Sequence, residues 1–127
     1  MGTHKYAIQT DIKDERSFSN VGEISQDLQR LQSEAHAFVV LEVSPAINNV
    51  TYIQAANHSY TKGLFSKKHI IETYTIELNI TESSGLKHYE YSSKDFKEIE
   101  KILVDYIDHL KTPDYSTWTD VTDVYFG

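Results

Sequence analysis

The last stretch of the chain combines acidic and aromatic side chains in a pattern that suits protein binding. No basic residue occurs after Lys111, and residues 113–126 interleave three aspartates with four aromatic side chains. Rigid aromatic groups are favoured anchors in protein interfaces, and an acidic rim around them steers a basic partner towards the surface. The alternative is that Tyr115 and Trp118 fold back and close one end of the core, while the aspartates turn the chain. The sequence leaves both interpretations open.

The distribution of charge favours the binding interpretation. Residues 65–127 hold seven lysines and twelve acidic residues, so this half carries −5 of the formal net charge of −7. An acidic surface gathered in the last helix and the tail would attract a basic partner. The predicted partner-binding residues are Glu100, Asp105, Asp108, Asp114, Trp118, Asp120 and Asp123.

A second candidate contact lies in the segment 57–69. Its thirteen residues are many for a connection between strands, and such long loops are often functional. The segment holds three lysines, no acidic residue, and apolar side chains that a solvated loop has no reason to carry. We predict a protruding hairpin that touches a partner through Lys62, Phe65 and Lys67. The alternative is a longer hairpin whose aromatic side chains pack locally.

Other kinds of chemistry find little support in the sequence. The absence of cysteine excludes disulfides, thiolate metal sites and a cysteine nucleophile. Six histidines stand at no spacing that would place two imidazoles on one helix or strand face, so no metal is expected. The five glycines form no phosphate-binding loop, and no Gly-x-Ser-x-Gly elbow occurs. We therefore expect neither a cofactor nor an enzymatic activity.

One alternative still involves acid–base chemistry. Glu77 and Glu90 lie on the two strands of a predicted hairpin, where a close pair of carboxylates would raise the pKa of one member. A curved sheet with helices could then form a pocket for a small enzyme or ligand-binding domain. Its lining would be Glu77 and Glu90 with Tyr52, Tyr74, Tyr89 or Tyr91. The simpler interpretation is a solvated sheet face dotted with charges.

Hydrophobic patterning predicts the elements that position these residues. Alternation predicts strands, and apolar steps of three and four predict helices. Asn20–Glu23 and Ser92–Asp95 have the spacing of capping boxes. The predicted strands cover residues 6–12, 38–43, 50–56, 70–80 and 86–91, and the predicted helices cover residues 21–33 and 96–110.

This order of elements predicts a single α+β domain over residues 1–127. The sheet is expected to be mostly antiparallel with four to five strands, and an N-terminal and a C-terminal helix are expected to pack on one face. In the strand 70–80, side chains alternate so that one face is expected to be buried and the other solvated. The stretch Asp11–Arg16 is expected to be a solvated loop.

Charge and hydropathy also bear on partners and location. A net charge of −7 argues against direct binding of nucleic acid or an anionic membrane, because both need a positive surface. No window approaches the length of a membrane span, and Met1–Lys5 lacks the start of a secretory signal. We therefore expect a cytoplasmic protein, while its oligomeric state stays undetermined.

Four segments, followed by a helix and the acidic tail with Trp118, form a recognisable layout: Phe38–Glu42, Tyr52–Ala55, Tyr74–Glu77 and His88–Tyr91. Over roughly residues 20–122, this layout resembles small bacterial immunity proteins of polymorphic-toxin systems, such as contact-dependent inhibition or type VII secretion. It implies a cytosolic protein that binds and neutralises a cognate, basic toxin domain. The same electrostatics would also suit a phage-type inhibitor that mimics nucleic acid.

Overall fold

Two kinds of apolar pattern build the fold: alternation along strands and three- and four-residue steps along helices. The structure is a computed structural model that describes residues 4–63 and 69–126. The strands are β1 (Lys5–Thr10), β2 (Arg16–Phe18), β3 (Phe38–Ser44), β4 (Val50–Asn57), β5 (Tyr60–Lys62), β6 (His69–Ile71), β7 (Tyr74–Glu82), β8 (Gly85–Ser93) and β9 (Thr119–Asp120). The helices are the 3₁₀ turn η1 (Val21–Ile24), α1 (Ser25–Ser33), α2 (Phe96–Asp108) and α3 (Thr122–Phe126).

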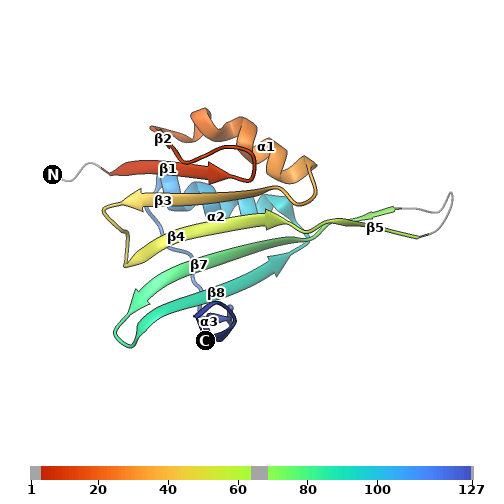
Figure 1. Cartoon of the computed structure of the whole chain (residues 1–127). Coiled ribbons are helices and arrows are strands. Elements are labelled where there is room, and N and C mark those ends of the chain that lie inside the picture. Colours follow the sequence, from red (N-terminus) through yellow and green to blue (C-terminus); the bar gives the residue numbers. More distant parts are fainter. Residues whose placement is uncertain (1–3, 64–68, 127) are drawn as a thin grey trace.

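One antiparallel sheet dominates the described part of the chain. Seven strands follow the order β2-β1-β3-β4-β7-β8-β9, and β5 and β6 form a separate pair (Figure 1). The predicted α+β class and the mostly antiparallel sheet are confirmed, but the sheet has more strands than the four to five expected. The edge strands β2 and β9 escaped prediction because three and two residues are too few to show a period.

The apolar core lies between the sheet and the two longer helices. Figure 1 shows α2 behind the sheet, α1 above β1, and α3 beside β8, and α1 contacts β3 and β4. Leu31 of α1 and Leu103 of α2 are fully buried, as are Ile53 and Leu78 on the sheet. Complete burial of such side chains is the main favourable term for this fold. Among the described residues, no helix has both the length and the apolar character needed to cross a membrane.

The predicted strand 70–80 is two strands in the structure. The chain leaves β6 at Ile71 and enters β7 at Tyr74, and the side chain of Ile70, expected on the buried face, is 70% exposed. β6 pairs only with β5, and together these strands form an arm that projects from the body (Figure 1). The β5–β6 pair is the described part of the hairpin that both interpretations of this segment expected, and Tyr60 in β5 is exposed.

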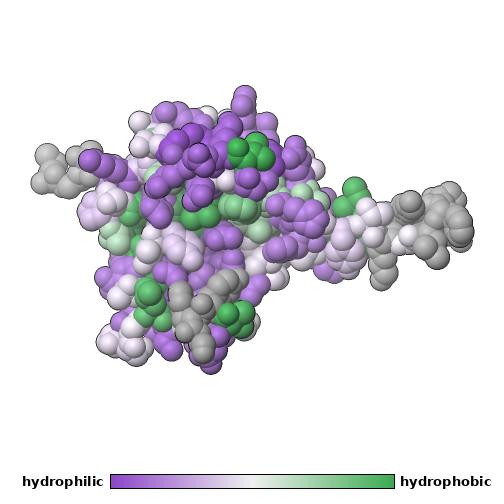
Figure 2. Space-filling model, in the orientation of Figure 1, coloured by the Kyte–Doolittle hydropathy of each residue, from purple (hydrophilic) through white to green (hydrophobic). Residues whose placement is uncertain are grey.

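Both faces of β7 are buried, so the expected solvated face was wrong. Thr75, Glu77 and Asn79, on the face away from the helices, are all less than a tenth exposed. β7 is an inner strand that pairs along most of its length with β4 and β8. On the same sheet face, Ala7, Val40 and Ala56 are half-buried. Figure 2 shows a hydrophobic band across the middle of the molecule.

Local signals near the chain turns were correct in part. The carboxylate of Glu23 accepts the N–H of Asn20 at 3.1 Å, as the predicted capping box requires. For α2 the predicted cap Ser92 is wrong: the helix begins after Asp95, whose side chain accepts the N–H of Lys97 at 3.0 Å. α2 also ends at Asp108, before Leu110, which has a positive φ of 51°.

Candidate functional site

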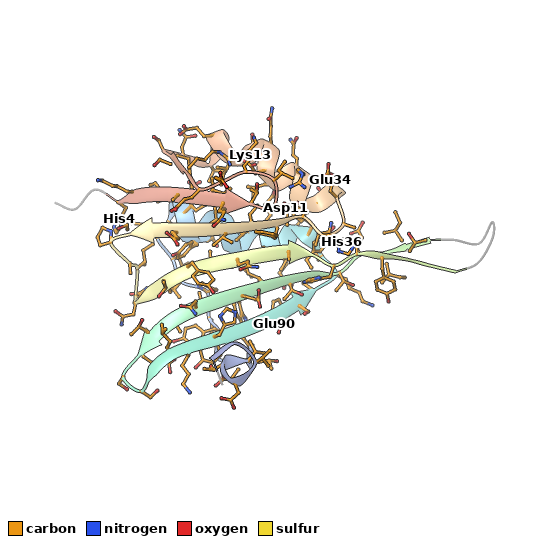
Figure 3. All side chains as sticks on the ribbon, in the orientation of Figure 1. His4, Asp11, Lys13, Glu34, His36 and Glu90 are labelled. Carbon is orange, nitrogen blue, oxygen red and sulfur yellow. The ribbon has the colours of Figure 1, made fainter. Side chains whose placement is uncertain are left out.

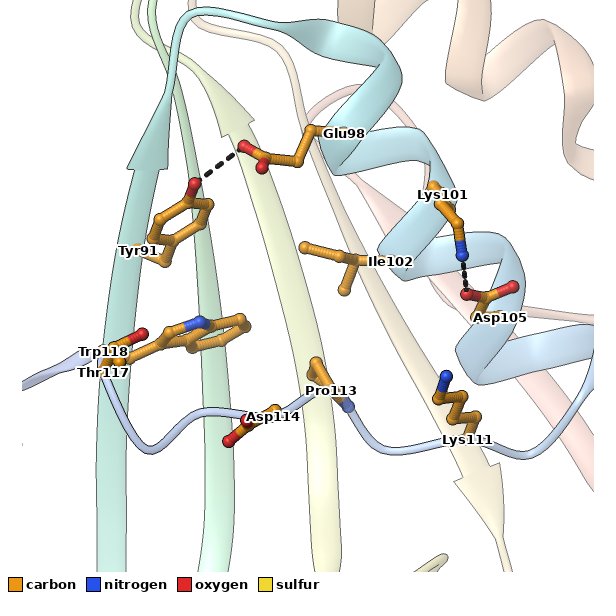
Figure 4. Close-up of a pocket in the computed structure, with 10 residues that line it drawn as sticks. All are labelled: Tyr91, Glu98, Lys101, Ile102, Asp105, Lys111, Pro113, Asp114, Thr117 and Trp118. Carbon is orange, nitrogen blue, oxygen red and sulfur yellow. Dashed lines mark hydrogen bonds and ion pairs between the residues drawn. The ribbon is translucent and has the colours of Figure 1, made fainter.

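A cleft of about 400 Å³ lies between α2 and the chain that follows it, and we call it the α2–tail cleft (Figure 4). It combines an aromatic wall with acidic and basic side chains. Three of the predicted partner-binding residues line it: Asp105, Asp114 and Trp118. The remaining lining residues are Tyr91, Glu98, Lys101, Ile102, Lys111, Pro113 and Thr117.

One face of α2 forms a side of the cleft. Glu98, Lys101, Ile102 and Asp105 follow one another at helical spacings, so their side chains point the same way. The opposite stripe of the helix carries buried residues such as Leu103 and holds α2 against the sheet. The amphipathic pattern that docks α2 therefore also presents these four side chains to the cleft.

The tail forms the other side because it folds back onto β8. β9 pairs antiparallel with Tyr89 and Glu90. The Trp118 indole stacks on Tyr91, with ring centroids 5.7 Å apart and planes 15° apart, and Tyr115 lies 4.9 Å from Tyr89 between ring centroids. Both tail aromatics are partly buried against the core. The tail therefore closes one end of the core, as the second interpretation expected, while Trp118 also lines the cleft and partner binding stays a prediction.

Hydrogen bonds fix the polar groups of the cleft. The Tyr91 hydroxyl donates to Glu98 at 2.8 Å, which raises the pKa of Tyr91. The Lys101 ammonium lies 2.6 Å from the Asp105 carboxylate and lowers the pKa of that group. Hydrogen bonds from Ser116 lower the pKa of Asp114.

These shifts settle the charge of two carboxylates. The ordinary pKa of an aspartate already lies well below 7, and the pKa of Asp105 and of Asp114 is lowered further, so both are ionised at neutral pH. With Glu98, the cleft holds three carboxylates against the two lysines Lys101 and Lys111. The cleft therefore carries a net negative charge beside its aromatic wall.

The other predicted acidic residues lie outside this cleft. Glu100 is half-buried and sits two positions from Glu98 along α2, which turns it away from the cleft face. Asp108 is exposed at the end of α2, and Asp123 is exposed in the first turn of α3. Asp120 accepts the N–H of Thr122 at 2.9 Å, so it helps to start α3.

The predicted second contact is described only in part. Lys62 is the last residue of β5 in the projecting arm, and Phe65 and Lys67 lie outside the described residues. A hollow at the base of the arm is lined by Tyr60 and Ile70 of the arm together with Gln32 of α1 and Ala35 just after this helix. It shares no lining residue with the α2–tail cleft.

The alternative pocket on the concave sheet does not form as predicted. Glu77 and Glu90 do pair across the β7–β8 hairpin. Tyr74, Tyr89 and Tyr91, however, point to the helix side, because alternate residues of a strand face opposite sides of the sheet. The sheet therefore separates these three tyrosines from the two glutamates.

A buried polar cluster occupies the sheet face that carries the two glutamates. His88, 1% exposed, places Nε2 3.3 Å from a Glu77 carboxylate oxygen and Nδ1 3.4 Å from the amide nitrogen of Asn79. This arrangement fits an imidazole with its proton on Nε2. Burial and then the charge of Glu77 raise the pKa of the nearby Tyr52. Glu90, labelled in Figure 3, lies on β8 directly opposite Glu77.

No metal-binding group of three or more histidine or acidic side chains occurs within the described ranges 4–63 and 69–126. The histidine of the buried cluster instead contacts one carboxylate and one amide at hydrogen-bond distance. These contacts account for polar atoms inside the sheet, since burial without partners would be costly.

Sequence reasoning missed several residues of the α2–tail cleft. Glu98, Lys101 and Ile102 could have been found, because they precede Asp105 by seven, four and three positions on one helix. Tyr91 and Lys111 had no such signal, since their place in the cleft depends on the path of the tail.

Comparisons with family models, with curated proteins and with solved structures found no match to this chain.

Proposed function

We propose that this protein works by binding another protein, and that it is a cytoplasmic immunity protein that neutralises a basic toxin domain. The observation that carries the proposal is the α2–tail cleft, where Tyr91 and Trp118 form an aromatic wall among three carboxylates. Binding energy in protein interfaces concentrates on aromatic anchors of this kind, surrounded by groups that exclude water.

The net charge supports a basic partner. A toxin domain that cleaves nucleic acid needs positive charge to hold phosphates, whereas this chain carries a formal net charge of −7. Opposite charges speed the encounter and disfavour wrong partners. An inhibitor must act before its target does damage, so fast association fits the proposed role.

The first test is rescue of growth. The upstream neighbouring gene is expected to encode a large secreted protein with a variable C-terminal domain. That domain should be toxic when produced alone in a bacterial cell, and co-expression of this chain should restore growth. The proposal is overturned if the neighbours are metabolic genes and the purified protein binds none of a panel of basic nuclease toxin domains.

The second test asks whether the α2–tail cleft forms the contact. The double variant Asp105→Asn/Asp114→Asn should weaken binding of the rescued toxin domain by about tenfold or more, because it removes two charges from the interface. Asp14→Asn/Glu15→Gln is the matched control, since Asp14 and Glu15 are exposed acidic residues outside the cleft. Calorimetry gives the affinities, and circular dichroism checks the fold. Equal affinity for the double variant and the control would exclude the cleft as the contact.

A further inference from the structure

We propose that the α2–tail cleft is a binding site for a single arginine side chain presented by the partner protein. This inference rests on the proposed function for the identity of the partner, and it adds the chemical group that the cleft takes. It is carried by the position of the aromatic wall relative to the carboxylates.

The aromatic wall suits a flat cation. One side of the Trp118 indole is stacked on Tyr91, and Trp118 and Tyr91 both line the cleft. A guanidinium group is planar, stacks on aromatic rings, and is attracted by the negative face of the ring. Ile102 adds an apolar surface for the methylene stem of the same side chain.

The carboxylates flank this wall. In Figure 4, Glu98 lies at the Tyr91 end of the wall and Asp114 lies beyond Trp118. Glu98 already holds the Tyr91 hydroxyl in place. Asp114 accepts the N–H of Ser116 at 3.1 Å, and this bond orients its carboxylate at the turn. A guanidinium group has five N–H donors, so it can reach more than one such acceptor.

The two lysines do not cancel the negative charge at the wall. Lys101 is paired with Asp105 at 2.6 Å, on the α2 side of the cleft. Lys111 lies near Asp105 in Figure 4, away from Tyr91 and Trp118. The aromatic part of the cleft is therefore flanked by two carboxylates, whereas the lysines neutralise the opposite part. A lysine of the partner would find the same charge, but its ammonium group has no planar face to stack on the ring and no rigid fork of donors.

The sole tryptophan of the chain makes the inference directly measurable. Trp118 fluorescence reports on this cleft alone, because no other residue contributes tryptophan emission. The probe is a blocked glycine–serine peptide with one central arginine, titrated into the purified full chain. We expect a saturable change in emission with a dissociation constant on the order of 1 mM. The matched control peptide carries neutral citrulline, which has the same shape, and should bind at least about fivefold more weakly.

Two conservative variants test the carboxylates. Glu98→Gln keeps an acceptor for the Tyr91 hydroxyl, and Asp114→Asn keeps an acceptor for the Ser116 N–H, so both should fold. Each should weaken binding of the arginine peptide by about threefold or more, because a charge-assisted hydrogen bond becomes a neutral one. Asp14→Asn should bind the peptide like the unaltered protein. Unchanged binding in both cleft variants would overturn the inference.

The peptide results separate this inference from the proposed function. Citrulline or lysine peptides that bind as tightly as the arginine peptide would overturn the assignment of arginine. A toxin domain that binds normally while the arginine peptide gives no saturable signal would do the same and leave the immunity role intact. Specific binding of the arginine peptide without any toxin partner would instead support the site and remove the immunity role.

Discussion

At the scale of single residues, Asp11 joins the loop after β1 to the end of α1. Its two carboxylate oxygens each accept an N–H of Arg30 at 2.6 Å, and Arg30 also lies 2.7 Å from Glu34. Asp11 further accepts the N–H of Phe38 at the start of β3 at 3.3 Å. Figure 3 labels Asp11 and Glu34. The two hydrogen bonds from one guanidinium group make this a strong kind of ion pair, despite its exposure.

The Asp11–Arg30 pair predicts a dependence of stability on pH. Hydrogen bonds from Arg30 lower the pKa of Asp11 from 3.8 to about 2. A lowered pKa in the folded state stabilises the fold above the ordinary value, and this contribution disappears as the pH falls through about 2. Asp11→Asn should therefore lower the free energy of unfolding by about 1 kcal/mol near neutral pH, allowing for solvent screening. In urea unfolding, the difference in the free energy of unfolding between the unaltered protein and Asp11→Asn should disappear between about pH 4 and pH 2. A gap independent of pH would contradict this account.

At the scale of elements, the start of α2 sets the position of one side of the cleft. Asp95 caps the helix, and Ser93 accepts the N–H of Asp95 at 3.0 Å. Asp95→Ala should lower the free energy of unfolding by about 1 kcal/mol, because the Lys97 N–H loses its acceptor. Ser92→Ala, at the predicted cap, should change it by less than about 0.5 kcal/mol. Chemical denaturation measures both variants, and a larger loss for Ser92→Ala would exclude Asp95 as the cap.

The elements also show how far sequence patterns reach. The strands near 38–43 and 50–56 were predictable because apolar residues run between clear turn signals, such as Asn48 and Asn49, which both adopt positive φ. The break between β6 and β7 could not be predicted, because it depends on which strands pair. β6 pairs with β5, whereas β7 pairs with β4 and β8. Likewise, the sequence indicated an acidic aromatic surface, whereas its meeting with Tyr91 depends on the long-range return of the tail.

At the scale of the whole molecule, the two surfaces proposed from the sequence are separate. The β5–β6 arm projects beyond the ends of β4 and β7, whereas the α2–tail cleft lies between α2 and the chain beside β8 (Figure 1). A partner residue held in the cleft therefore need not touch the arm. In the proposed complex, the charged groups of the cleft would act at the contact, whereas the formal net charge of −7 would act on the partner at a distance.

This division predicts how salt affects binding of the toxin domain identified by growth rescue. Between about 50 mM and about 500 mM NaCl, the association rate constant should fall by about tenfold or more, because mobile ions screen the long-range attraction. The dissociation rate constant should change much less, since packed contacts in the cleft control it. Biolayer interferometry measures both. Asp114→Asn should mainly speed dissociation, whereas the distant Asp14→Asn should leave dissociation unchanged. An association rate that does not vary with salt would show that the net charge plays no part in finding the partner.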